Sequence, residues 1–213
     1  MFSISIVRAE DWDEGRFLTG DAGGLPADAQ NTFGRVGVPL DTITGALVNP
    51  SGFDMFRIFL NGTTPFSATT ISTPSGAGFL ADSVLSLYTE DGVGIYANND
   101  TSSAEVRSTL PDRSLPAGIY NLLITSSGRN PVSADGRIFN LGAATDILTP
   151  TGPGGALPIS GYNNVGTSSG QYTVTLTGAQ FAVAIPETGT LPLLAAGSLL
   201  TGGVLCRKRR RSK

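Results

Sequence analysis

The chain has 213 residues, with 14 basic and 17 acidic side chains, one cysteine and no histidine. This length supports one main domain with short appendages, and an apolar content of 40% is enough for a packed core. The lack of histidine excludes Ser-His-Asp and Cys-His nucleophiles and every histidine-bearing zinc site, and a single cysteine excludes an internal disulfide.

The basic side chains are concentrated at the C-terminal end of the sequence. Six of the 14 lie in the last seven positions, so the preceding 206 residues carry 8 arginines against 17 acids, a net charge of −9. A body with this charge repels phosphate backbones, and we therefore expect no nucleic-acid partner.

Residues 1–19 are interpreted as an N-terminal arm or the remnant of a signal peptide. Met1–Val7 is apolar, but a secretory apolar region needs about 7–15 residues behind a basic start. Val7 and Ala9 are small residues three and one positions before Glu10, as at a signal cleavage site. We hypothesise that the chain begins inside a longer signal peptide; a plain N-terminal strand is the alternative, with Trp12 packing the arm.

Residues 20–178 are predicted to form one domain of short strands. Apolar runs alternate with Gly, Pro, Asn and Asp clusters, and in the last run Tyr172, Val174 and Leu176 alternate with threonines, the period of a half-buried strand. No helical crossover is available for a parallel sheet, so we predict an all-β, antiparallel, jelly-roll-like β-sandwich. The clearest strands are Thr42–Val48, Phe53–Leu60, Phe66–Ile71, Val84–Thr89, Gly94–Ala97, Ile119–Ser126 and Gln171–Thr177.

The stretch from Asn140 to Gly170 is rich in glycine, with segments such as Thr151–Gly155 and Thr167–Gly170. Its composition predicts a long irregular loop, either flexible or capping one edge of the sandwich.

The end of the chain has three parts: a linker at 179–190, an apolar segment at 191–206 and a basic tail at 207–213. The sixteen residues Leu191–Cys206 carry no charge and are apolar on every face. As a helix they would span about 24 Å, slightly less than the roughly 30 Å hydrocarbon core of a bilayer. A buried core helix is the alternative, but the adjoining basic cluster favours a short transmembrane helix with its tail in the cytoplasm and the body outside.

A short Pro-Glu motif stands just before this segment. Together with the apolar helix and the arginine cluster it resembles the PEP-CTERM sorting signal of Gram-negative bacteria, with Ile185 in place of the usual Val and Thr188 in place of the second Pro. The segment is also similar to the LPXTG signal that sortases read. The PEP-CTERM resemblance implies processing by an exosortase-type enzyme. The implied sorting motif is Ile185, Pro186, Glu187, Thr188 and Gly189, and the implied stop-transfer residues are Arg207, Lys208, Arg209, Arg210 and Arg211.

The order of motifs in the body resembles the bacterial pre-peptidase C-terminal domain, a jelly-roll-like sandwich. The corresponding segments are Phe53–Ile58, Leu85–Gly92, Leu115–Tyr120 and Tyr172–Leu176. The first lacks the family's first Asp, and Gly20–Pro26 replaces its usual start. The resemblance covers roughly residues 20–178 and implies the same fold.

We expect no cofactor, with a weak calcium site as the alternative. Carboxylate and amide oxygens are the ligands that calcium prefers, and loops at the ends of sandwiches commonly supply them. The simpler explanation is that Asp and Asn favour turns because they bond to their own backbone. The calcium candidates are Asp82, Asp91, Asn98, Asn99 and Asp100.

These features predict a non-catalytic protein of the cell envelope or extracellular matrix. The precursor would sit in the inner membrane with its body on the periplasmic side, and the processed body would lie in the envelope or outside the cell, where extracellular polysaccharide is a candidate partner. The alternatives are a carbohydrate-binding module, a carboxylate-dependent hydrolase and a sortase-anchored wall protein. For the hydrolase, no spacing among the 17 acids selects a catalytic pair.

Overall fold

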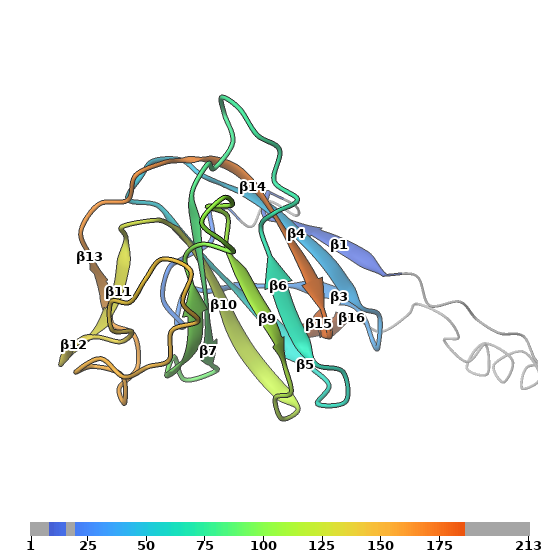
Figure 1. The fold of residues 1–213 in the computed structure, drawn as a ribbon. Coiled ribbons are helices and arrows are strands. Elements are labelled where there is room, and N and C mark those ends of the chain that lie inside the picture. Colours follow the sequence, from blue (N-terminus) through green and yellow to red (C-terminus); the bar gives the residue numbers. More distant parts are fainter. Residues whose placement is uncertain (1–8, 16–19, 186–213) are drawn as a thin grey trace, which may run out of the picture.

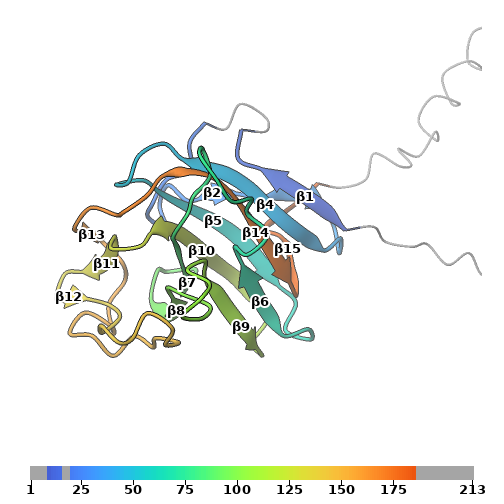
Figure 2. The same cartoon turned by 45° about the horizontal axis from the view of Figure 1, so that its top comes forward.

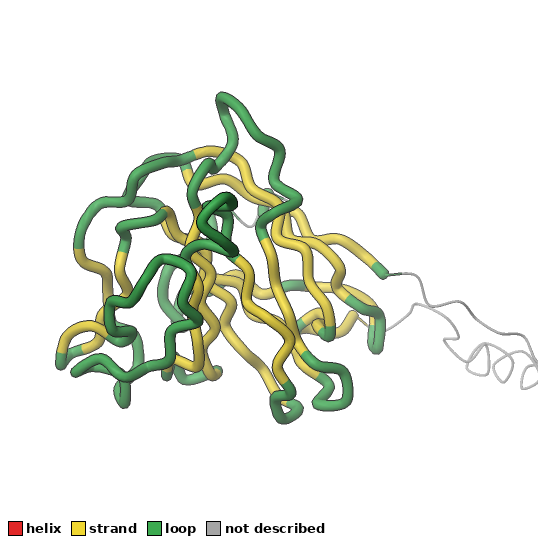
Figure 3. The backbone as a smooth tube through the Cα atoms, viewed as in Figure 1, coloured by secondary structure: helices red, strands yellow, loops and turns green. Residues whose placement is uncertain are grey.

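The computed structural model describes residues 9–15 and 20–185, and these residues form strands and loops without a helix (Figure 3). The strands are β1 (Glu10–Asp13), β2 (Gln30–Asn31), β3 (Phe33–Arg35), β4 (Leu40–Leu47), β5 (Phe53–Leu60), β6 (Phe66–Thr69), β7 (Ser83–Thr89), β8 (Gly94–Asn98), β9 (Thr109–Arg113), β10 (Gly118–Ser126), β11 (Asn130–Ser133), β12 (Gly136–Arg137), β13 (Gly161–Asn163), β14 (Gly170–Thr177), β15 (Ala179–Phe181) and β16 (Val183–Ile185). All seven predicted strands are confirmed, with ends that shift by at most two residues.

Two main sheets form the sandwich-like body (Figure 1). The first has the order β1-β4-β14-β6-β9, and the second has the order β15-β5-β10-β7-β8, with β2 pairing on β5. A smaller sheet, β12-β11-β13, and the pair β16-β3 complete the described structure.

The sheets are mixed, which corrects the prediction of a purely antiparallel sandwich. β1 runs parallel to β4, β2 runs parallel to β5, and β16 runs parallel to β3. Parallel neighbours need a connection of a dozen or more residues, which an irregular loop supplies as well as a helix does. Residues 14–39 provide this length between β1 and β4, so the lack of helical crossovers did not exclude parallel pairing.

The main core lies between the two large sheets and consists of side chains that alternate along each strand. Ile43 and Val174 of the first sheet and Phe56 and Leu122 of the second are all buried within one apolar cluster. Trp12 of β1 is 0% exposed and belongs to the same cluster. The structure therefore places strands in both segments that we expected to flank the domain: β1 within residues 1–19, and β15 and β16 within residues 179–190.

The second sheet is buried on its outer face as well. Here the segment 129–165, which carries β11, β12 and β13, lies against β10 and β7 (Figure 2). It covers a second apolar cluster, made of Met55, Tyr88, Ala97, Leu123, Ile138, Phe139 and Ile159. The glycine-rich stretch 140–170, predicted to be an irregular loop that is either flexible or caps one edge, includes strand β13 and part of this cover over a sheet face, where its Ile159 is 5% exposed and belongs to the second cluster.

Candidate functional site

The predicted sorting motif begins where the last described strand ends. Ile185 is the final residue of β16 and pairs with Arg35 of β3. Pro186, Glu187, Thr188 and Gly189 lie outside the described residues, as do the apolar segment 191–206 and the basic residues 207–211. Within residues 9–15 and 20–185, no helix has the length and apolar character to cross a bilayer.

Four of the five calcium candidates lie at one end of the β7–β8 hairpin. Leu85 pairs with Asn98, so the antiparallel register brings Asn99 and Asp100 toward Asp82, the residue before β7. Asp91 lies in the turn at the other end of this hairpin, roughly 20 Å away at about 3.3 Å per residue.

The fourth residue, Asn98, has a side chain that is already fully engaged. Its Oδ1 accepts a hydrogen bond from the backbone N–H of Thr109 at 2.9 Å. Its Nδ2 donates to the carbonyl oxygens of Asp100 and Asp146. Asn98 therefore fixes the loop that carries the neighbouring acid and contributes no free oxygen to a cation.

Asp82, Asn99 and Asp100 share a feature that ordinary turn residues lack. Each has a buried Oδ1 with no hydrogen-bond partner. Burial, together with the nearby charge of Asp100, raises the pKa of Asp82 to about 6. Carboxylate and amide oxygens are the ligands that calcium prefers, so these three oxygens are the ones that a calcium site at this end of the hairpin would use.

The calcium site and the turn explanation predict different results in a titration. If the three oxygens bind calcium, added calcium raises the melting temperature of the wild type and leaves that of Asp82→Asn unchanged. If these residues only form turns, calcium changes neither melting temperature.

A second polar site was not predicted from the sequence. Carboxylate oxygens of Glu14, Asp21 and Asp54 lie within 4.8 Å of one another. Glu14 follows β1, Asp21 lies in the next loop, and Asp54 is in β5, so residues far apart in sequence meet where the two large sheets face each other. Glu14 and Asp54 are only 6% and 2% exposed.

The hydrogen bonds of this carboxylate cluster show how two buried acids coexist. Tyr172 of β14 donates its hydroxyl to Asp54 Oδ2 at 2.7 Å. Glu14 accepts backbone N–H groups from Ala22 at 2.7 Å and Ala46 at 3.1 Å. Burial and the charge of Glu14 raise the pKa of Asp54 to about 8. Asp54 is therefore protonated at neutral pH, so the folded protein does not hold two adjacent buried charges.

One glycine makes room for the cluster. A Cβ at Gly45, in the middle of β4, would collide with the hydroxyl of Tyr172 and the carboxylate of Glu14. Glycine within a strand marks such a close approach. The signal that could have found the cluster is Asp54 itself, because it shares the inward face of β5 with Phe56 and Ile58.

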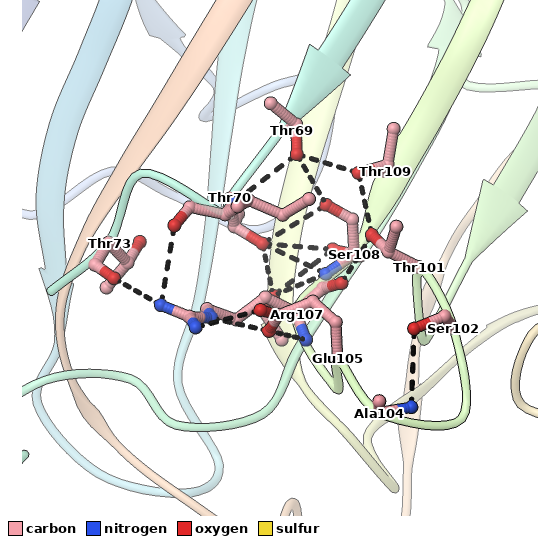
Figure 4. A network of polar contacts seen from close by, with 12 residues as sticks. Thr69, Thr70, Thr73, Thr101, Ser102, Ala104, Glu105, Arg107, Ser108 and Thr109 are labelled. Carbon is pink, nitrogen blue, oxygen red and sulfur yellow. Dashed lines mark hydrogen bonds and ion pairs between the residues drawn. The ribbon is translucent and has the colours of Figure 1, made fainter. Parts of the chain in front are cut away.

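A network of hydroxyl groups closes the end of the first sheet near β6 and β9 (Figure 4). Thr70 Oγ1 lies 2.6 Å from Ser83 Oγ, which lies 3.2 Å from Ser108 Oγ. Arg107 pairs with Glu105 and donates to the carbonyl oxygen of Thr73. These contacts join the chain after β6 to the start of β7 and to the chain before β9, and the three hydroxyls are buried, so the network is structural.

No protein-family model matches the chain, and a search of curated proteins finds no significant match. The resemblances to the PEP-CTERM signal and to the pre-peptidase C-terminal domain therefore remain predictions from the residues that carry them.

Proposed function

We propose that this chain is a non-catalytic exported protein whose body is delivered by a PEP-CTERM-like C-terminal signal. The observation that carries the proposal is the direct succession of three sequence elements behind β16: a Pro-Glu motif, sixteen uncharged residues and an arginine cluster. Pro186 has no N–H to continue a β-ladder and favours extended backbone at Ile185 just before it, so a processing enzyme would meet the motif directly at the end of β16.

The proposed partner is an exosortase-type enzyme in the inner membrane. The precursor would hold its apolar segment in the bilayer, with the basic residues 207–211 on the cytoplasmic side and the body in the periplasm. After processing, the body would reside in the envelope or the extracellular matrix. We also propose that the body is a jelly-roll-like sandwich similar to the pre-peptidase C-terminal domain.

Burial of the carboxylate cluster supports the non-catalytic part of the proposal. A hydrolase that used Glu14 and Asp54 would have to bring a substrate to both groups, but Asp54 is 2% exposed and does not line the cavity of about 410 Å³ that Glu14 borders. Their hydrogen bonds to Tyr172 and to backbone N–H groups already engage them. The carboxylate-dependent hydrolase is therefore only the second candidate. A hydrolytic activity of the wild type that is lost in Glu14→Gln would favour it.

Mass spectrometry of the mature C-terminus tests the sorting proposal. In a host with an exosortase, we expect a cut near Pro186–Glu187, and we expect the double variant Pro186→Ala/Glu187→Ala to accumulate as uncut precursor. Glu90→Ala, which removes an exposed acid from a turn, is the matched control and should mature normally. Normal maturation of the double variant, or full-length wild type free in the cytosol, would contradict the proposal. A cut made only in a host with a sortase would support the wall-anchored alternative.

A further inference from the structure

A cavity of about 380 Å³ opens between the outer face of the β7–β8 hairpin and the cover segment 129–165. Its 18 lining residues include two arginines and four asparagines, and none of them is Asp or Glu. This composition is opposite in charge to the body as a whole, which carries an excess of acids. Cavities of roughly 300–1,000 Å³ are the usual size of small-ligand sites.

The two arginines, Arg129 and Arg137, are held by the cover without a carboxylate partner among the described residues. The guanidinium of Arg129 lies 5.0 Å from the ring centre of Tyr162 and 5.7 Å from that of Phe53, and its Nη1 donates to the carbonyl oxygen of Asn164 at 2.6 Å. Arg137 lies in β12, opposite Val132 of β11. The aromatic rings and this hydrogen bond fix the guanidinium of Arg129, and the β11–β12 pairing places Arg137 at the same cavity.

Two residues on the cavity wall also have unsatisfied polar groups. Arg129 Nε and Arg137 Nη1 are buried and have no hydrogen-bond partner. Buried polar groups are nearly always paired, since an unpaired one destabilises the folded protein. Arginine N–H groups that lack an acceptor on one wall are the arrangement expected where an anionic ligand accepts their hydrogen bonds.

We propose that this cavity binds a carboxylate-bearing sugar unit of an acidic polysaccharide. Guanidinium groups pair with carboxylates through two parallel hydrogen bonds. The asparagine amides and the hydroxyl of Ser127 suit sugar hydroxyls, and Phe139 and Leu148 offer an apolar surface to the face of a sugar ring. The proposal rests on the exported location proposed above, because such polymers are met outside the cytoplasm.

Calorimetric titration of the full chain, purified in mild detergent, tests this inference. The probes are trigalacturonate, neutral maltotriose of the same length, and inorganic phosphate. We expect trigalacturonate to bind at least about tenfold more tightly than either of the others, and its binding to weaken as salt is raised. Arg137→Gln should weaken trigalacturonate binding about tenfold, whereas Arg113→Gln, an exposed arginine of β9, should leave it unchanged.

Each other outcome overturns part or all of the proposal. Equal binding of maltotriose removes the role of the carboxylate, and equal binding of phosphate removes the role of the sugar. Wild-type affinity in a folded Arg137→Gln, with folding checked by the fluorescence of the buried Trp12, removes the cavity as the site. Failure of all three probes to bind the wild type refutes the inference but leaves C-terminal processing intact, because that is measured separately.

Discussion

The buried pair formed by Asp54 and Tyr172 predicts that the protein becomes less stable as the pH rises. The folded state holds the Asp54 proton up to a pKa of about 8, whereas the unfolded chain releases it near the ordinary value of 3.8. Between these values the folded state binds one proton more than the unfolded state, so the free energy of unfolding falls with increasing pH. The stabilisation is complete below the lower pKa and is lost as the pH passes through the upper one.

Asp54→Asn should remove this dependence. One pH unit corresponds to about 1.4 kcal/mol, so across about three units, from near pH 4 to pH 7, the wild type loses up to about 4 kcal/mol that the variant keeps. The amide oxygen of the substituted side chain can still accept the Tyr172 hydroxyl, and its N–H₂ can donate to the adjacent carboxylate of Glu14. We therefore expect the variant to match the wild type near pH 4 and to be more stable near pH 7.

Urea denaturation at these two pH values measures the effect. Trp12 is the single tryptophan of the chain and is 0% exposed, so its emission reports unfolding of the sandwich. Asp112→Asn, an exposed aspartate of β9, is the matched control and should change stability little at either pH. A variant at Asp54 that is destabilised equally at both pH values would refute the reasoning, because the wild-type carboxyl would then not carry a raised pKa.

Two further predictions concern the backbone and the hydroxyl network. Gly178→Ala should lower the free energy of unfolding by more than about 2 kcal/mol in chemical denaturation, because φ is +74° and the new Cβ would lie 2.5 Å from the carbonyl oxygen of Pro65. Gly37→Ala is the control: φ is +71° but nothing lies within 4 Å of the new Cβ, so the loss should be only about 1 kcal/mol. Equal losses in the two variants would show that the contact with Pro65 is unimportant. Thr70→Val should lower stability by about 1–3 kcal/mol, since it leaves two buried serine hydroxyls with fewer partners; an unchanged melting temperature would mean that these serines find other partners.

The strands with strong apolar patterns were predictable from the sequence, and the short strands were not. β5 and β14 have eight residues each, and their apolar residues recur often enough at alternate positions to predict a strand. β2 and β12 have two residues each and exist because neighbouring strands offer hydrogen-bond partners, which is a tertiary effect. Successive residues of β10 are buried because the cover segment 129–165 packs on its outer face. The alternation of residues along a strand does not indicate which segment covers its outer face, so this cover was not predictable.

The candidate sites show the same division between local and tertiary information. Turn composition drew attention to Asp82, Asn99 and Asp100, but only the strand register brings them to one end of a hairpin. The carboxylate cluster and the arginine-lined cavity join residues separated by tens of positions, so no motif marks either of them. The one usable local sign was Asp54, an acid on the inward face of an otherwise apolar strand.

The central place of β14 makes the first sheet depend on the last part of the body to be synthesised. β14 joins β4 on one side to β6 on the other, so a nascent chain that ends before residue 170 has two separate halves of this sheet with open edges toward each other. Such edges recruit other chains, and a half-emerged protein would be sensitive to aggregation. Under the export scheme proposed above, the first sheet would be completed only after the residues just ahead of the proposed C-terminal signal had crossed the membrane, so folding of this sheet and processing of the signal would occur at the same stage.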